Sequence, residues 1–407
     1  PKFFVKNDKE FLTITTNYFK LEYQKEKPFY GTKIAPDINL RISLNNTDKL
    51  WFFGAPEARN FKGTSYSLDD IDGTANFEKG LYSTDGFASI DDSNSLIIND
   101  DGSLIKREDE RIDTYVFLYR KDFGYCLRDY FKLTGKPPLI PRYALGNWWN
   151  KNIAYTDKQI NELIENFKYH NIPLSIILLN KDWHLKYEGT NSGFTFNYNL
   201  IDNPKELIDN LHNNNIHIGL NINPMEGISP DEIAYNRFKQ ESKYEGEGII
   251  PFNVYNPDML NAYFDELIKP LYDFGTDFFW IDYNNPKNIS ILRTLNRYHT
   301  YDFKRFFNKR PMILSRNGLI ASHKYPILYS GQTIVSWKNL NLVPEFNSKS
   351  SNIGISFWSH DIGGYKLGTE DPELYMRFVQ LGTYSPILRF SSDTSHYYKR
   401  EPWLWDV

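Results

Sequence analysis

The chain has 407 residues, which is too long for one ordinary core but suits a barrel of roughly 250 residues with a second domain. Its formal charge is −4 without any Lys/Arg run, and no apolar stretch reaches the roughly 18 residues that span a bilayer, so neither nucleic acid nor a membrane is an expected partner. The single cysteine, Cys126, excludes an internal disulfide framework and favours a reducing, cytoplasmic location.

The first part of the chain is typical of an antiparallel β-sandwich. Short segments of alternating hydrophobicity, such as 11–16 and 114–119, are separated by Gly, Asn and Asp turns. Residues 136–141 contain three prolines, which disfavour helix and suit a linker. We therefore predict an N-terminal β-sandwich domain over residues 1–140 and a second domain over residues 141–407.

The second domain alternates strand and helix patterns. Thr156 and Gln159 form a plausible capping box, which is followed by apolar residues at helical spacing: Ile160, Leu163, Ile164 and Phe167. A further helix is predicted over 259–267, between the third and fourth strands. The predicted strands are 143–148, 174–179, 217–222, 278–282, 311–315, 326–329, 354–358 and 386–390.

Eight strands with intervening helices predict an α/β fold of the (β/α)8 TIM-barrel class. The chain stops just past the eighth strand, so we expect a barrel without its closing helix and a missing C-terminal part. A further C-terminal polypeptide or a homo-oligomer would then cover the open edge.

Polar and aromatic residues gather where the predicted strands end, and Asp282 stands out because it closes a buried strand with a carboxylate. Side chains at the carboxyl ends of barrel strands meet at one rim, which is where barrel enzymes carry their chemistry. The candidates on this rule are Trp148, Trp149, Asn180, Asp182, Asn221, Trp280, Asp282, Arg316, Gln332, Trp358, His360, Asp361, Arg389 and Ser391.

Four segments, 280–284, 314–316, 329–337 and 358–364, resemble glycoside hydrolase family 31, the retaining α-glucosidases and α-xylosidases. The resemblance implies that Asp282 is the nucleophile and that Trp280 walls the sugar subsite. It places Arg316 beside Asp282, where a guanidinium keeps a carboxylate charged. It also makes Asp361 a bidentate acceptor of sugar hydroxyls, and Asp85 part of a sandwich-domain loop over the active-site mouth.

Three positions depart from the family pattern. Gln332 stands where family members have the general acid/base aspartate, and an amide cannot protonate a leaving group. Asn180 replaces a sugar-binding aspartate, and Ser391 replaces a histidine. We expect an α-glucosidase-type enzyme that acts on small α-linked sugars by a retaining mechanism and is impaired at the acid step. The alternative is a catalytically inactive carbohydrate-binding or scaffold protein with the same fold.

Structural interpretations compete with these functional ones. Asp282 could cap the next helix, and Arg316 and Asp361 could form a structural ion pair. Core packing and sugar stacking are both open interpretations for each of three tryptophans, Trp148, Trp149 and Trp358. His360 is interpreted as a packed or hydrogen-bonded histidine, so we expect neither a metal nor a cofactor. Asp182 is a weak substitute for the missing acid.

Overall fold

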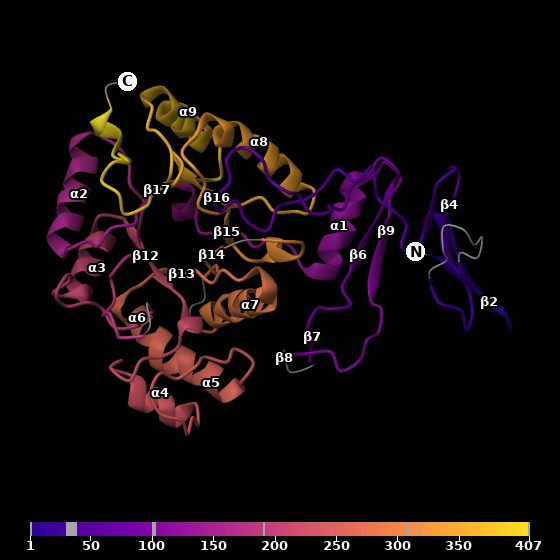
Figure 1. Ribbon diagram of the computed structural model, residues 1–407, viewed down its shortest axis with the longest axis horizontal. Coiled ribbons are helices and arrows are strands. Elements are labelled where there is room, and N and C mark those ends of the chain that lie inside the picture. The colour runs from indigo at the N-terminus through magenta and orange to yellow at the C-terminus, as the bar shows by residue number, and fades with distance from the viewer. Residues whose placement is uncertain are drawn as a thin grey trace.

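The computed structural model describes residues 2–29, 39–99, 103–189, 192–306, 309–316 and 318–405. Among these residues, eight parallel strands close into a barrel, in which each strand pairs with the next and the last pairs with the first (Figure 1). The predicted barrel is confirmed, and its closure leaves none of these strands with an open edge. The strands are β10 (Asn147–Lys151), β11 (Ile176–Leu179), β12 (His217–Ile222), β13 (Phe278–Ile281), β14 (Ile313–Arg316), β15 (Ile327–Tyr329), β16 (Trp358–Ile362) and β17 (Ile387–Ser392).

Helices surround the barrel on its outside (Figure 1). The predicted helix over 259–267 lies inside a longer helical run that includes one π-helical segment, Tyr263–Ile268. The helices of this domain are α2 (Asp157–Tyr169), α3 (Pro204–Asn213), α4 (Tyr235–Glu241), α5 (Pro257–Ala262), α6 (Lys269–Phe274), α7 (Ile289–Phe306), α8 (Trp337–Ser351) and α9 (Pro372–Thr383).

Helix α2 begins with the predicted capping box. Thr156 accepts a hydrogen bond from the backbone N–H of Gln159, and the Gln159 side chain accepts one from the backbone N–H of Thr156, at 3.2 and 2.9 Å. This exchange satisfies two backbone donors that the first helical turn leaves without partners. The buried face of the helix consists of the four predicted residues, Ile160, Leu163, Ile164 and Phe167.

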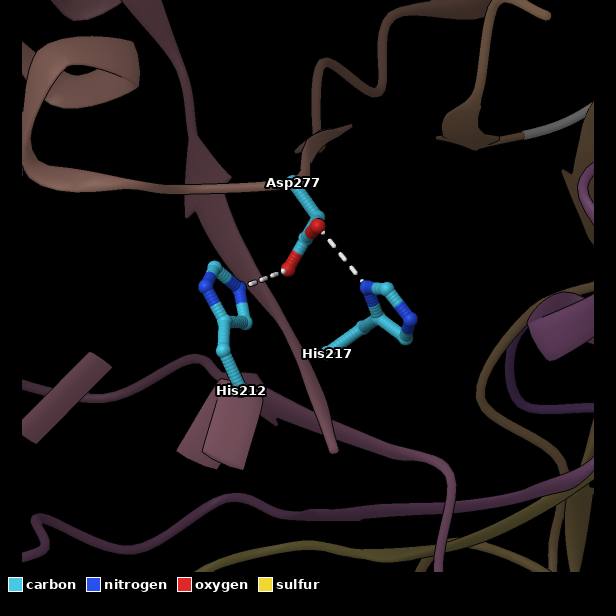
Figure 2. Close-up of side chains that lie close together, drawn as sticks. All are labelled: His212, His217 and Asp277. Atoms are coloured by element: carbon cyan, nitrogen blue, oxygen red, sulfur yellow. Dashed lines mark hydrogen bonds and ion pairs between the residues drawn. The ribbon is translucent and has the colours of Figure 1, made fainter. Parts of the chain in front are cut away.

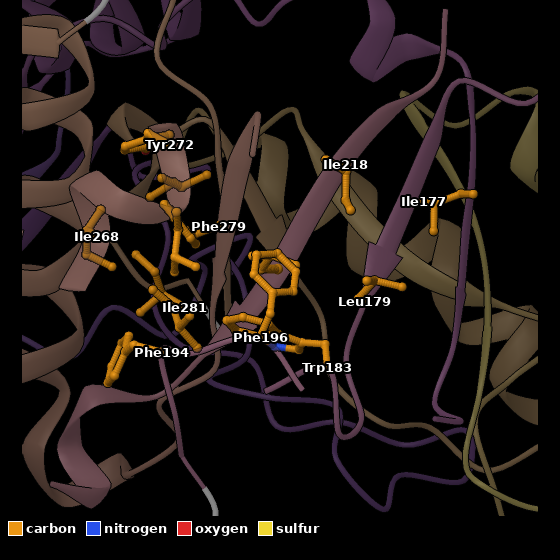
Figure 3. Close-up of a cluster of buried hydrophobic side chains, with 14 of the residues drawn as sticks. Ile177, Leu179, Trp183, Phe194, Phe196, Ile218, Ile268, Tyr272, Phe279 and Ile281 are labelled. Carbon is orange, nitrogen blue, oxygen red and sulfur yellow. The ribbon is translucent and has the colours of Figure 1, made fainter. Parts of the chain in front are cut away.

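Successive residues of each barrel strand point alternately inward and outward. The outward residues pack under the helices in the main hydrophobic core, part of which Figure 3 shows: Ile177 and Leu179 of β11, Ile218 of β12, Phe279 and Ile281 of β13, and Ile268 and Tyr272 of the helical run. The inward residues form a second cluster inside the barrel, which includes Trp148, Leu178, Phe278, Trp280, Leu314 and Tyr329. The site at the rim is therefore carried by inward-facing positions.

The first strand, expected over 143–148, starts later, because Arg142–Leu145 form a 3-10 turn and β10 begins at Asn147. The seventh strand also differs from the prediction. It was expected over 354–358, but β16 begins at Trp358 and runs to Ile362. Residues 354–357 instead connect α8 to the strand, and Gly354 adopts a φ of +79°, which ends the helix rather than starting a strand. Residues expected beyond the strand end, including Asp361, therefore lie within the strand.

The N-terminal part contains antiparallel sheets, as predicted. A five-stranded sheet packs against the β6–β9 pair through a small core of Ile42, Leu44, Trp51 and Phe87. The strands are β1 (Phe3–Asn7), β2 (Phe11–Thr16), β3 (Phe19–Gln24), β4 (Leu40–Leu44), β5 (Leu50–Phe52), β6 (Phe87–Asp91), β7 (Ile97–Ile98), β8 (Leu104–Ile105) and β9 (Thr114–Leu118).

The N-terminal part also contains a helix that we did not predict, α1 (Phe123–Thr134). It carries Cys126, which is buried, and burial raises the pKa of its thiol to about 12. One hydrophobic cluster joins α1 to the barrel, with Cys126 and Tyr130 beside Phe346 and Trp358. The two parts of the chain thus share a core. In the part of the chain described here, no helix has the length and apolar character required to cross a membrane.

Candidate active site

Asp282 lies at the rim of the barrel. Its backbone N–H extends the β12–β13 ladder by donating to the carbonyl of Ile222 at 3.0 Å, which fixes where its side chain emerges. Arg316 and Asn221 donate one hydrogen bond each to its two oxygens, at 3.0 and 3.1 Å. About a quarter of the side chain, 24%, remains exposed. Asp282 does not cap the next helical turn, because Asn285 does so.

Arg316 is the centre of the charged network. It ends β14, its side chain is only 7% exposed, and its two terminal nitrogens bind different carboxylates, Asp282 at 3.0 Å and Asp69 at 2.6 Å. Burial acts to lower the pKa of Arg316, but the two carboxylates and Tyr329 outweigh it and raise the pKa above its ordinary value. A fixed positive charge therefore stands beside Asp282 at every physiological pH.

Asp69 comes from the N-terminal part of the chain and was not among the predicted site residues. Besides Arg316, it accepts hydrogen bonds from the backbone N–H of Gln332 at 2.7 Å and from the Asn284 side chain at 2.9 Å. Burial acts to raise the pKa of Asp69, but the charge and hydrogen bond of Arg316, with the Gln332 N–H, lower it overall. Asp69 is therefore ionised at neutral pH.

The expected role of Asp85 must be corrected. An N-terminal loop does reach the barrel rim, but the acid that touches Arg316 is Asp69. Asp85 forms ion pairs with Lys49 and Arg59 inside the N-terminal domain, at 3.4 and 3.5 Å. Both acids lie in turn-rich sequence, so no local signal distinguished them. Only the contact between the two domains distinguishes Asp69 from Asp85.

Gln332 lies on the loop that follows β15, and this loop runs alongside the N-terminal segment. Its carbonyl accepts from the N–H of Asp70 at 3.0 Å, and the carbonyl of Ser330 accepts from Leu68 at 2.7 Å. Gly331 allows this approach, because a Cβ atom there would lie 2.7 Å from the Asp69 backbone nitrogen, and its φ is +126°. The network thus connects Asp282 to the Gln332 backbone through Arg316 and Asp69.

Asp361 is enclosed, contrary to its expected role as a sugar ligand. It accepts hydrogen bonds from Arg389 at 2.7 Å and from the Tyr329 hydroxyl at 2.6 Å, and no part of its side chain is exposed. The competing ion-pair interpretation fits, but the partner is Arg389 rather than Arg316. Arg389 is fully buried as well and lies over the Tyr329 ring, 4.7 Å from its centroid. Asp361, Arg389 and Tyr329 therefore form a buried group of contacts that stabilises the barrel interior.

The tryptophans separate into inward and outward positions. Trp280 faces the interior and packs edge-on against Tyr329, with ring centroids 5.2 Å apart. Trp148 is fully buried in the same interior cluster and donates its indole N–H to the carbonyl of Ala144. Trp149 points outward into the main core.

Trp358 is not part of the site. Its ring packs outside the barrel, with its centroid 4.7 Å from that of Phe346 of α8. It is also the first residue of β16, so it lies at the start of the strand and not at its carboxyl end. This position does not fit its expected role in sugar binding.

The remaining candidates take different positions. Asn180 follows β11 and is half-buried, while Ser391 is buried within β17. Asp182 forms an ion pair with Lys186 at 3.0 Å.

His360 is a packed and hydrogen-bonded histidine, as expected. It contacts Ser330 and Asn347, and burial together with Arg389 lowers its pKa to about 3.

Several buried polar atoms of this region find no hydrogen-bond partner among the residues that the structure describes. They are Trp280 Nε1, Arg316 Nε and Ser391 Oγ. Leaving a buried donor or acceptor unpaired costs about 1–3 kcal/mol, so such atoms call for a water or a ligand. In the described chain, the one group of His and acid side chains with metal-ligand spacing lies elsewhere, at the start of β12 and β13.

A closed barrel with a partly exposed carboxylate and a buried guanidinium at the carboxyl ends of its strands defines a TIM-barrel protein with an enzyme-type site. Comparison with known families matches residues 137–407 to the "Glycosyl hydrolases family 31 TIM-barrel domain". The chain therefore belongs to glycosyl hydrolase family 31.

Curated relatives agree with this assignment. An alpha-xylosidase of Saccharolobus solfataricus is 27% identical over 325 residues, which cover 72% of this chain and 43% of the relative. Alpha-glucosidase 2 of Bacillus thermoamyloliquefaciens is 25% identical, over 72% of this chain and 41% of the relative. The chain thus spans about two fifths of the length of these relatives.

Solved structures share the fold. A GH31 alpha-xylosidase from a soil metagenome, complexed with xylose, superposes with a TM-score of 0.71 at 16% identity. The match covers 98% of this chain and 71% of that one. A cycloalternan-forming enzyme from Listeria monocytogenes superposes equally well, at 18% identity, over 99% of this chain and 47% of that one.

Proposed function

We propose that this chain forms the sugar-binding and nucleophilic part of a retaining α-glycosidase, with Asp282 as the nucleophile. The observation that carries the proposal is the position of Asp282: partly exposed at the barrel rim, with Arg316 and Asn221 holding its two oxygens. The unpaired polar atoms of Trp280, Arg316 and Ser391 support a ligand that is rich in hydroxyl groups.

The chemistry of the first step follows from this arrangement. An ionised carboxylate attacks the anomeric carbon, the bond to the leaving oxygen breaks, and a glycosyl ester forms on Asp282. The Arg316 charge favours the ionised form of Asp282 and holds its orientation. Both α-glucosides and α-xylosides fit the proposal, since relatives of both kinds match the chain.

The leaving group determines how fast this step proceeds. The resemblance to the family puts Gln332 at the acid/base position, and an amide has no acidic proton to give to the leaving oxygen. Asp69 cannot replace it, because its lowered pKa keeps it ionised at neutral pH. We therefore propose that substrates with good leaving groups are cleaved, whereas ordinary α-linked disaccharides are cleaved about 10²–10⁴-fold more slowly than by an intact acid/base pair.

The test compares substrates on the full chain. Aryl α-glycosides or α-glycosyl fluorides should be cleaved readily and α-linked disaccharides only slowly, and the Asp282→Asn variant should cleave none of them. A fluorinated glycosyl fluoride, which slows the second step, should leave a sugar covalently attached to Asp282, detectable by mass spectrometry. Azide needs no general base, so it should accelerate turnover of aryl glycosides and yield a glycosyl azide.

The second candidate is a carbohydrate-binding protein without turnover. The amide at Gln332 and the enclosed carboxylate of Asp361 favour it, because two acids with family roles are then absent or inaccessible. This candidate requires sugar binding by calorimetry with no covalent adduct on Asp282. An adduct would exclude it, whereas its absence together with inactivity on glycosyl fluorides would exclude the first candidate.

A further inference from the structure

Three side chains with metal-ligating atoms meet at the opposite end of the barrel from Asp282. His212 lies in the last turn of α3, His217 is the first residue of β12, and Asp277 immediately precedes β13. Figure 2 shows both imidazole rings turned toward the Asp277 carboxylate. The ligand atoms of the three residues all lie within 4.8 Å of one another.

The geometry of the group is specific. His212 Nε2 lies 2.9 Å from one oxygen of Asp277, and His217 Nδ1 lies 2.8 Å from the other. The backbone N–H of Ile218 donates to the carboxylate at 2.9 Å, and the Asp277 N–H donates to the Ile218 carbonyl at 3.0 Å. The Tyr143 ring stacks on His217 with centroids 3.6 Å apart. Backbone bonds and stacking thus orient two of the three ligands.

We propose that His212, His217 and Asp277 bind one divalent transition-metal ion, with Zn²⁺ as the preferred occupant. Two imidazoles and one carboxylate are a common zinc ligand set, with Zn–N and Zn–O distances of about 2.0–2.2 Å. A tetrahedral ion with such bonds separates its ligand atoms by about 3.3 Å. The ligand atoms of the three residues lie within 4.8 Å of one another, so rotations of the side chains must bring them to this spacing. Ligation requires lone pairs on the ring nitrogens that face Asp277.

The surroundings leave room for a further ligand. The side chains of His212, His217 and Asp277 are 35%, 29% and 18% exposed, so water can complete the coordination from the solvent side. A carboxylate that binds a metal usually also accepts a hydrogen bond from the protein, and the Ile218 N–H donates one to Asp277.

This site is structural rather than catalytic. It joins the end of α3 to the starts of β12 and β13, on the barrel face that serves stability rather than chemistry. A bound ion would hold that helix end against the two strands, and one of these strands carries Asp282 at its other end.

The experiment is a Zn²⁺ titration of the full chain after treatment with a chelator, followed by calorimetry and thermal unfolding. We expect one equivalent of Zn²⁺ to bind and to raise the melting temperature, since a ligand specific for the folded state stabilises it. Co²⁺ in place of Zn²⁺ should give the visible absorption of a tetrahedral site. His217→Ala and Asp277→Asn should each weaken binding at least about tenfold.

The matched control is His396→Ala, which removes an exposed histidine outside the group and should leave binding unchanged. His212→Gln replaces the most exposed of the three ligands, so it serves as a second variant if the others fail to fold, as judged by circular dichroism. Absence of stoichiometric binding at about 100 μM Zn²⁺ would overturn the proposal, as would equal binding by the folded His212→Gln variant. Neither readout depends on glycosidase activity.

Discussion

Arg316 holds together two carboxylates that are far apart in sequence. Asp282 is 34 residues upstream, and Asp69 is 247 residues upstream, yet each binds one of its terminal nitrogens. If one of these partners were removed, the guanidinium would keep a single carboxylate, and one of its buried N–H groups would lose its acceptor, which costs about 1–3 kcal/mol. The two carboxylates therefore both stabilise the buried guanidinium, and the proposed reaction uses Asp282.

Replacing Gln332 with Asp should restore a proton donor at the acid/base position. We expect a gain of about 10²–10⁴-fold in kcat/KM for an α-linked disaccharide and a much smaller gain for an aryl glycoside, whose leaving group needs little protonation. Gln332→Asn is the control, because it shortens the side chain without adding an acid. If Gln332→Asp cleaves disaccharides no faster than Gln332→Asn, the rest of the site has also diverged.

Replacing Asp69 with Asn should destabilise the protein by about 1–3 kcal/mol at pH 7. The pKa of Asp69 is lowered in the folded state, so the unfolded chain binds more protons in the acidic range. The contribution of Asp69 is therefore fully present above its ordinary pKa of 3.8 and is lost as the pH falls through the lowered value. Urea unfolding of the wild type and of Asp69→Asn, at pH 7 and near pH 3, measures this difference in unfolding free energy.

Asp70→Asn is the neighbouring control for this measurement. Asp70 is 65% exposed and pairs with Lys366 at the surface, so its replacement should change stability by less than about 0.5 kcal/mol. A difference between wild type and Asp69→Asn that stays constant down to pH 3 would contradict the assigned pKa direction.

At the scale of elements, strand β16 decides which side chains reach the site. It starts at Trp358 rather than ending there, and Trp358 faces α8, while Asp361 lies inside the barrel with Arg389. A shift of four residues keeps each side chain on the same face of the strand, but it moves Trp358 from the carboxyl end, where the rim lies, to the start of the strand. The shifted strand therefore explains why neither residue lies where it was expected.

Trp358→Phe should separate packing from sugar binding. The smaller ring leaves space beside Phe346, so we expect a loss of about 1–3 kcal/mol in unfolding free energy with unchanged sugar affinity. Trp280→Phe, inside the barrel, is the comparison and should weaken sugar binding. Denaturant unfolding and sugar titration of both variants provide the measurement. A weaker sugar affinity in folded Trp358→Phe would restore its place in the site.

At the scale of the whole molecule, the N-terminal part packs against the outside of the closed barrel and adds a residue to the charged network at its rim. Leu68 is fully buried in the cluster that contains Phe346 and Trp358, and the Asn339 side chain of α8 bonds to the backbone of Ile71 and Gly73. Asp69 lies in the same segment. Stability and site geometry both depend on this docking.

The barrel segment 137–407, expressed alone, should therefore lose native packing. Its exposed face would include Leu328, Phe346 and Trp358, which pack against N-terminal residues in the full chain. We expect strong binding of a hydrophobic dye, association in gel filtration and loss of sugar binding, each compared with the full chain. A monomeric fragment that melts as sharply as the full chain would show that the barrel is independent.

The sequence by itself determined the local features of this protein. The alternation of strand and helix patterns predicted the barrel, the spacing of Thr156 and Gln159 predicted the start of α2, and a strand ending in a carboxylate marked Asp282. These signals are local because backbone periodicity and capping depend on residues a few positions apart.

Only the tertiary structure decided that Asp69 rather than Asp85 contacts Arg316, that Trp358 faces outward, and that His212 and His217 meet Asp277. Each of these depends on residues 60 or more positions apart, or on which face of a strand a side chain occupies. Composition and spacing do not encode such contacts locally, because strand register and the docking of one domain on another set them.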